Sequence, residues 1–357
     1  MASIKLAVQD VLVPGGSAAA RFESARKLGF DGVELRGREL WRKQKEFAKA
    51  ALDTGVSVST LCPIVEPQML AAELSEREAA SDEAKRNIEL AGELGAVGVI
   101  LVPVFGPSRL PDLTPFGDPT EIEDKLLLSQ LPELNAEASA AGTYVLVEPL
   151  NRYETHYLNR LAQAVDIVKR SRLSNVKVMA DLFHMNIEEA DPAAALRAAG
   201  DLVEHVHASD SNRGLPGTGH IDFKSAVAVL SRMGYGGYLA VEAEPEVPGP
   251  DALAKCAGFL RECTGGKATP KAAPKGAAKG AAKGAARGAV KEAVKGAESP
   301  AKPRRRKRGG KSKKPATGAA AKKTEAKKPA AKKTEAKKPA GKKKSSRKRG
   351  GRRRRSR

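Results

Sequence analysis

Short apolar runs alternate with longer amphipathic stretches through the first 265 residues of the chain. Eight runs rich in β-branched and aliphatic residues predict strands, at Ile4–Val8, Gly32–Leu35, Val56–Leu61, Val97–Val102, Tyr144–Glu148, Val176–Asp181, Glu204–Ala208 and Tyr238–Glu242. The stretches between them carry helical periodicity, as at Ala18–Lys27, Glu83–Leu94, Leu126–Ala140, Leu158–Lys169, Ala193–Ala198, Phe223–Met233 and Asp251–Arg261. Glycine follows several of these stretches, as it does at helix C-termini, at Gly29, Gly95, Gly142 and Gly234.

Eight strands that are each followed by a helix predict parallel pairing, because parallel strands need long crossover connections. A closed (β/α)8 TIM barrel satisfies this pattern in about 250 residues. A doubly wound open sheet is the alternative. It would carry a glycine-rich phosphate loop after the first strand, where this chain has only Pro14-Gly15-Gly16. The sequence therefore favours the barrel over residues 1–265.

The charge of the chain changes sign at the end of this region. The whole chain carries a formal charge of +21, but residues 267–357 hold 36 Lys or Arg against 4 Glu, and residues 1–266 hold 27 Lys or Arg against 38 Asp or Glu. An acidic body of −11 thus precedes a basic arm of +32. Such asymmetry predicts two separate units, a barrel at 1–265 and a tail at 266–357.

The tail is built from low-complexity basic sequence. It lacks aromatic residues and repeats the decapeptide AKKTEAKKPA at 321–330 and 331–340. It cannot bury enough apolar surface to offset the entropy of ordering, so we expect it to be disordered. A polycation of this charge binds polyanions by releasing counterions, without sequence preference. The expected partner is DNA or another polyanion, with a double helix favoured because stacking aromatics are missing. The densest blocks are Arg304, Arg305, Arg306, Lys307 and Arg308, and Arg352, Arg353, Arg354 and Arg355.

Cellular location is indicated by what the sequence lacks. The three cysteines show neither metal-type spacing nor a disulfide framework, which fits a reducing compartment. The N-terminus enters a strand-like run directly, and no apolar stretch approaches the ~20 residues of a membrane span. We therefore expect a cytoplasmic protein without membrane contact, associated with the nucleoid through its tail.

The last four predicted strands end in residues that can bind a metal. They deliver Glu148, Asp181, His207 and Glu242 to the carboxyl end of the barrel, where the active sites of TIM barrels lie. Each follows a buried apolar strand, where an unpaired charge is costly and a divalent cation would offset that cost. Three carboxylates and one imidazole suit Mn²⁺, Co²⁺ or Mg²⁺ better than structural zinc. Ordinary polar strand ends are the alternative, and four in succession make it the weaker one. We expect His205 to point outward from the barrel.

Three segments resemble a known family. They are VEPLNRYE at 147–154, DLFHMNIEE at 181–189 and HASDSNR at 207–213. They are similar to the metal and substrate segments of the D-tagatose 3-epimerase and D-psicose 3-epimerase group, within the xylose-isomerase-like TIM barrels. The tail lies outside the resemblance and looks like the C-terminal arms of linker histones and bacterial nucleoid proteins.

The resemblance implies a function and assigns residues to it. Glu148, Asp181, His207 and Glu242 match the metal ligands, and Glu148 and Glu242 also match the acid–base pair. Further matches, at the positions that bind substrate oxygens, are Glu154, His184 and Arg213. A ketose isomerase or epimerase with one divalent ion, Mn²⁺ before Co²⁺ or Mg²⁺, is implied, together with a sugar substrate and a homo-oligomer.

Departures from the group leave the sugar open. The segment after Arg213 is glycine-rich, Gly214–Asp222, where the group has a bulkier basic one. The eighth strand leads into Glu242-Ala243-Glu244-Pro245 rather than Glu-Pro-Phe. Related barrels that act on hydroxypyruvate, inososes or 3-keto sugars therefore remain alternatives.

A DNA-repair nuclease is the rival from another class. Endonuclease IV-type apurinic-site enzymes share this kind of barrel and would benefit from a basic tail. Their trinuclear zinc centre needs several histidines, some from the first half of the barrel, whereas all five histidines here lie between His156 and His220. A DNA-compacting protein built on an inactive barrel is a third alternative, and four intact ligand positions argue against it.

Overall fold

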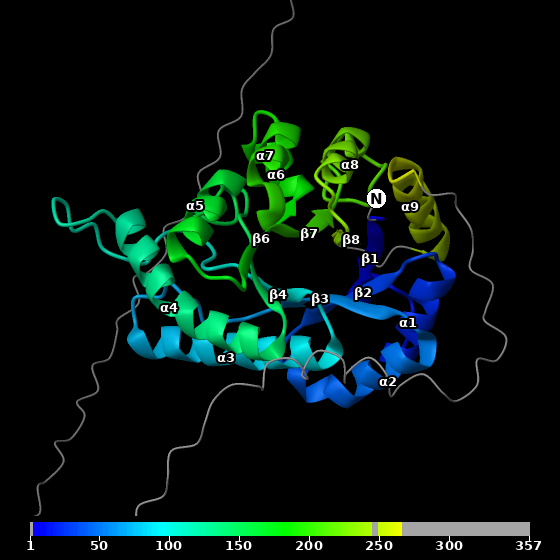
Figure 1. Ribbon diagram of the computed structural model, residues 1–357, viewed down its shortest axis with the longest axis horizontal. Helices are drawn as coiled ribbons and strands as arrows, with labels where there is room; N and C mark the ends of the chain where they lie inside the picture. The colour runs from blue at the N-terminus through cyan, green and yellow to red at the C-terminus, as the bar shows by residue number, and fades with distance from the viewer. Residues whose placement is uncertain (1–2, 245–248, 266–357) are drawn as a thin grey trace, which may run out of the picture. The chain divides into compact units, whose positions relative to one another are not determined.

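Eight parallel strands close into a barrel in the computed structural model, which describes residues 3–244 and 249–265. The closure is made by β1 and β8, which pair in register from Lys5 opposite Tyr238 to Val8 opposite Val241. The strands lie at the centre with the helices outside them (Figure 1). Their bounds are β1 Lys5–Gln9, β2 Gly32–Gly37, β3 Ser57–Pro63, β4 Gly98–Leu101, β5 Tyr144–Val147, β6 Val176–Asp181, β7 Val203–Ala208 and β8 Tyr238–Val241. The predicted TIM barrel is confirmed.

Helices follow the strands as crossovers. They are α1 Ala18–Lys27, α2 Gln44–Thr54, α3 Leu74–Leu94, α4 Pro119–Ala141, α5 Leu161–Ser171, α6 Leu182–Glu188, α7 Pro192–Ala199, α8 Phe223–Arg232 and α9 Pro250–Cys263. Short 3₁₀ helices lie at Asp10–Leu12, Leu40–Lys43 and Gly200–Leu202. Asp118 begins α4 by accepting a hydrogen bond from the Glu121 amide, and Gly142 ends it with a φ of 69°. Such local signals explain why most of these helices could be predicted.

One short helix, α6, was missing from the predicted set. It begins directly after the last residue of β6. The Asp181 side chain accepts hydrogen bonds from the amides of Phe183 and His184 and so caps α6. A seven-residue helix is too short for its periodicity to stand out from the strand before it.

The interior of the barrel is separate from the layer beneath the helices. The larger apolar cluster, which includes Phe22, Leu127 and Phe223, joins helices to strands. Ile100, Leu146 and Met179 form a smaller cluster. Leu146 and Met179 lie two residues before Glu148 and Asp181 and share their inward face. The barrel is therefore filled with side chains beneath the rim, and its chemistry is confined to the carboxyl ends of the strands.

Two sets of predictions fall outside this description. The tail at 266–357, with its two arginine-rich blocks, lies beyond the described residues. The domain division at 265 stays a prediction. Within residues 3–244 and 249–265, no helix combines the length and hydropathy that a membrane crossing requires.

Candidate active site

The four predicted strand-end residues meet at the carboxyl end of the barrel. His207 Nδ1 lies 3.8 Å from Glu148 Oε1, 3.7 Å from Asp181 Oδ2 and 3.0 Å from Glu242 Oε2. All four side chains are buried. They come from β5 to β8 because each strand delivers its last inward residue to the same rim.

This cluster fits a divalent cation. Ligand atoms of Glu148, Asp181 and His207 lie within 4.8 Å of one another, as those around a single ion do. Among the described residues, His207 Nδ1 is a buried nitrogen without a hydrogen-bond partner, although three carboxylates face it. A buried nitrogen without a partner is costly unless a ligand completes it. Three carboxylates and an imidazole form the donor set that Mn²⁺, Co²⁺ and Mg²⁺ accept.

The two glutamates have opposite electrostatic environments. Burial raises the pKa of Glu148 well above its usual value, and the charges on Glu242 and Asp181 raise it further against the effect of His207. Burial also acts on Glu242, but the imidazole of His207 and the guanidinium of Arg213 outweigh it and lower its pKa. Two carboxyl groups whose pKa values are pushed apart can hold and release a proton in turn.

Arg213 and His184 complete the polar side of the site. Arg213 donates through one terminal nitrogen to Asp181 at 3.2 Å and through the other to Glu242 at 3.1 Å. Its backbone is in the left-handed region with a φ of 59°, a costly conformation for arginine that is common at functional sites. His184 Nδ1 accepts from the Asn151 amide at 3.1 Å, so His184 Nε2 carries the hydrogen and lies 3.6 Å from Asp181 Oδ2.

Glu154 lies nearer the opening. Its Oε1 is 3.8 Å from His184 Nδ1 and accepts a hydrogen bond from the Asn151 side chain at 3.1 Å. Its side chain is 40% exposed, in contrast to the buried cluster. The structure thus brings all seven predicted barrel residues into one site.

A cavity of about 220 Å³ opens onto this cluster. Its polar wall contains Glu148, Glu154, His184, Arg213 and Glu242, and also Arg36 from β2. Its apolar wall comes mainly from β3, β4 and the loops after them, and includes Ile64, Met69, Leu101 and Phe105. The cavity is below the ~300 Å³ at which pockets for drug-sized ligands begin, so it suits a small polar molecule with one apolar face.

His205 corrects one prediction. It was expected to point outward, but it is fully buried inside the barrel, and its Nε2 lies 2.8 Å from Glu34 Oε2. Residues i and i+2 of a strand share a face, and the residue between them alternates. His205 and His207 therefore point the same way, and Val206 faces the helices.

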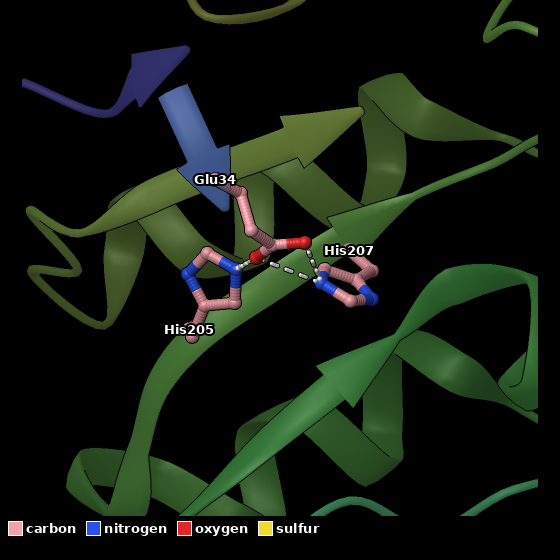
Figure 2. A group of neighbouring side chains, drawn as sticks. All are labelled: Glu34, His205 and His207. Carbon is pink, nitrogen blue, oxygen red and sulfur yellow. Dashed lines mark hydrogen bonds and ion pairs between the residues drawn. The ribbon is translucent and has the colours of Figure 1, made fainter. Parts of the chain in front are cut away.

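Glu34 is a buried residue that the sequence reasoning missed. Its carboxylate from β2 lies between the rings of His205 and His207 from β7 (Figure 2). Gln9 Nε2 at the end of β1 donates both to Glu34 at 3.0 Å and to Glu242 at 2.9 Å. A glutamate in the middle of the apolar run Gly32-Val33-Glu34-Leu35 was the available signal, because a charge there must have buried partners.

Comparisons with known proteins find relatives of this barrel. A family model described as a xylose isomerase-like TIM barrel matches residues 22–263. The 3-dehydro-D-guloside 4-epimerase of Escherichia coli K12 is 32% identical over 248 residues, which cover 68% of this chain and 94% of that protein. A D-psicose 3-epimerase of Agrobacterium fabrum is 40% identical over 129 residues, 36% of this chain and 44% of that one. The crystal structure of apo 3-keto-D-glucoside 4-epimerase from E. coli superposes with a TM-score of 0.67 at 31% identity, covering 73% of this chain and 100% of that one.

Proposed function

The chain belongs to the xylose isomerase-like TIM barrel family, among its sugar epimerases and isomerases, and from that premise we propose that it epimerises or isomerises a keto sugar with one divalent metal ion. The observation that carries the proposal is the buried cluster of Glu148, Asp181, His207 and Glu242 at the base of a small cavity. Its preferred ion is Mn²⁺, with Co²⁺ or Mg²⁺ as substitutes.

Glu148 and Glu242 move the proton in this mechanism. A divalent ion held by Glu148, Asp181, His207 and Glu242 would supply Lewis-acid stabilisation of the negative charge that develops on the substrate. One glutamate removes the proton next to the carbonyl on one face of the substrate, and the other returns a proton on the opposite face, which inverts that carbon. Return of the proton to the neighbouring carbon would isomerise the sugar instead.

Arg213, His184 and Glu154 hold the substrate. The hydrogen on His184 Nε2 and the guanidinium of Arg213 are donors for sugar oxygens, and Glu154 is an acceptor for a hydroxyl. Arg36 is a further donor from β2 that lines the cavity, and its Nε lies 3.9 Å from Glu242 Oε1. The apolar wall faces the carbon-bound hydrogens of the ring or chain. We infer a non-phosphorylated substrate, because the sequence after the seventh and eighth strands shows no obvious phosphate-binding motif.

Solvent proton exchange tests this function directly. The full chain, loaded with Mn²⁺ and incubated with a panel of ketoses and 3-keto sugars in D₂O, is expected to incorporate deuterium beside the carbonyl of at least one of them. NMR identifies the labelled carbon, and chelation of the metal should stop the exchange. If no sugar takes up deuterium and the same preparation cleaves a DNA duplex with an abasic site, the proposed epimerase or isomerase function is wrong and the nuclease function replaces it.

We also propose that the tail at 266–357 binds nucleic acid without sequence preference. Deleting it is expected to leave kcat and KM within about 2-fold, because every proposed active-site residue lies in the barrel. Retention on duplex DNA at low salt should be lost, since counterion release scales with the number of phosphate contacts. A variant with glutamine only in the blocks 304–308 and 352–355 removes 9 of the 36 positive charges and should elute at intermediate salt. Equal DNA retention by all three proteins would contradict the role of the tail.

A further inference from the structure

Glu34 is a buried carboxylate surrounded by hydrogen-bond donors. It is completely shielded from solvent. Its Oε2 accepts from Thr60 Oγ1 at 2.5 Å and from His205 Nε2 at 2.8 Å. Its Oε1 accepts from Gln9 Nε2 at 3.0 Å and lies 3.0 Å from His207 Nε2.

The carboxylate of Glu34 accepts hydrogen bonds from Gln9 Nε2 and Thr60 Oγ1, and this acceptor role fixes the state of the His207 ring. Because Nε2 faces Glu34, that nitrogen carries a hydrogen. The neutral ring then has its lone pair on Nδ1, the atom that faces Glu148, Asp181 and Glu242. A metal ligand must offer a lone pair, so the Nε2–H form is the one that can bind the ion. The other tautomer would aim a hydrogen at the metal site.

Gln9 extends the same arrangement to the second glutamate of the acid–base pair. Its Nε2 donates to Glu34 Oε1 and to Glu242 Oε1, so one amide group spans both carboxylates. Glu242 Oε2 is left facing His207 Nδ1 and Arg213. Glu34 thus reaches two of the four proposed metal ligands, one directly and one through Gln9.

We propose that Glu34 is a positioning residue that holds His207 in its metal-binding tautomer and, through Gln9, orients Glu242. The inference rests on the proposed function. His205 supports this proposal. Its ring packs edge-on against the His207 ring, with 5.2 Å between the ring centroids, and donates a hydrogen bond to the carboxylate of Glu34. Figure 2 shows the carboxylate lying between the two rings.

An alternative interpretation is that Glu34, His205 and His207 bind a second metal ion, because their ligand atoms lie close enough together to hold an ion. Hydrogen bonding explains the group better. The nitrogens of His205 and His207 that face Glu34 lie at hydrogen-bond distances, and Thr60 and Gln9 occupy further acceptor positions of the carboxylate. The hydrogen-bonding interpretation of Glu34 therefore predicts one metal ion per chain.

Metal titration without substrate tests the proposal. In Glu34→Gln, we expect the Kd for Mn²⁺ measured by calorimetry to rise about 10- to 100-fold, as for other partners of metal-bound histidines. Stoichiometry should be one in the unaltered protein. Thr143→Val is the matched control, because it also deletes a fully buried polar group, at the amino end of β5. It should leave the Kd unchanged.

The tautomer of His207 separates positioning from simple charge. Long-range ¹H–¹⁵N NMR of the metal-free protein should show the Nε2–H form in the unaltered chain and a mixture in Glu34→Gln, since the new amide can donate to Nε2. Weaker metal binding with an unchanged tautomer would mean that Glu34 acts only by its charge and would overturn the proposal. Two ions per chain would overturn it as well.

Two further variants keep the test open if Glu34→Gln does not fold. Glu34→Asp keeps the charge but shortens the reach, and should raise the Kd for Mn²⁺ by less than Glu34→Gln does. Gln9→Met removes the hydrogen bonds to Glu34 and Glu242 but keeps the contact between Glu34 and His207, and should lower kcat more than it raises the Kd for Mn²⁺. Unchanged values in both would overturn the proposal while leaving the proposed function intact. Failure of the unaltered protein to bind metal or exchange protons would instead overturn the function.

Discussion

Replacing Glu242 by Gln is expected to lower kcat by about 10³-fold, within the 10²- to 10⁴-fold range of general acid–base groups. The amide keeps the size of the side chain but can neither take up nor release a proton at neutral pH. It also removes the ion pair with Arg213, whose terminal nitrogen lies 3.1 Å from Glu242 Oε2. Loss of negative charge beside His207 should weaken metal binding at the same time. Turnover is measured on the sugar identified by deuterium exchange, at saturating Mn²⁺.

A control variant separates the chemistry from the loss of a partly buried carboxylate elsewhere in the barrel. Glu204 lies near the amino end of β7, where its pKa is raised by burial, and pairs with Lys177 at 3.8 Å. Glu204→Gln makes the same chemical change at the opposite end of the barrel and should leave kcat unaffected. Full activity of Glu242→Gln at saturating metal would contradict the assignment of Glu242 to the acid–base pair.

Removal of the metal is expected to have the second large effect. A chelated, dialysed protein should lose at least about 10³-fold in turnover, because Lewis-acid stabilisation supplies several kcal/mol. Mn²⁺ should restore activity. The ion should also raise the melting temperature, since a ligand at 100 times its Kd that binds only the folded state stabilises it by about 2.7 kcal/mol.

Asp181 provides the control for metal removal. Asp181→Ala deletes a carboxylate within 3.7 Å of His207 Nδ1, so its melting temperature should no longer rise with Mn²⁺. The Asp181 side chain also caps α6, so this variant should begin from a lower melting temperature. If protein shown to be metal-free by elemental analysis kept its full kcat, the role of the ion would be refuted.

Local sequence patterns were sufficient for the barrel and for the residues at its rim. The strand at Val176–Asp181 and the helix at Ala18–Lys27 were predicted with the bounds that the structure has. Alternating strands and helices, without a glycine-rich phosphate loop after the first strand, favoured a parallel barrel over an open sheet. In that barrel the order of strands along the chain is their order in space. The last inward residues of four successive strands therefore had to be neighbours.

The environment of those rim residues was decided by tertiary structure. Glu34 lies 171 positions from His205 in the chain, and Gln9 lies 233 positions from Glu242. No spacing rule connects residues that far apart. They become neighbours only when β1 pairs with β8 and β2 faces β7 across the barrel. The sequence by itself thus determined which residues reach the rim, because strand periodicity is local. Barrel closure alone decided which buried partners hold them and which nitrogen of His207 faces the proposed metal.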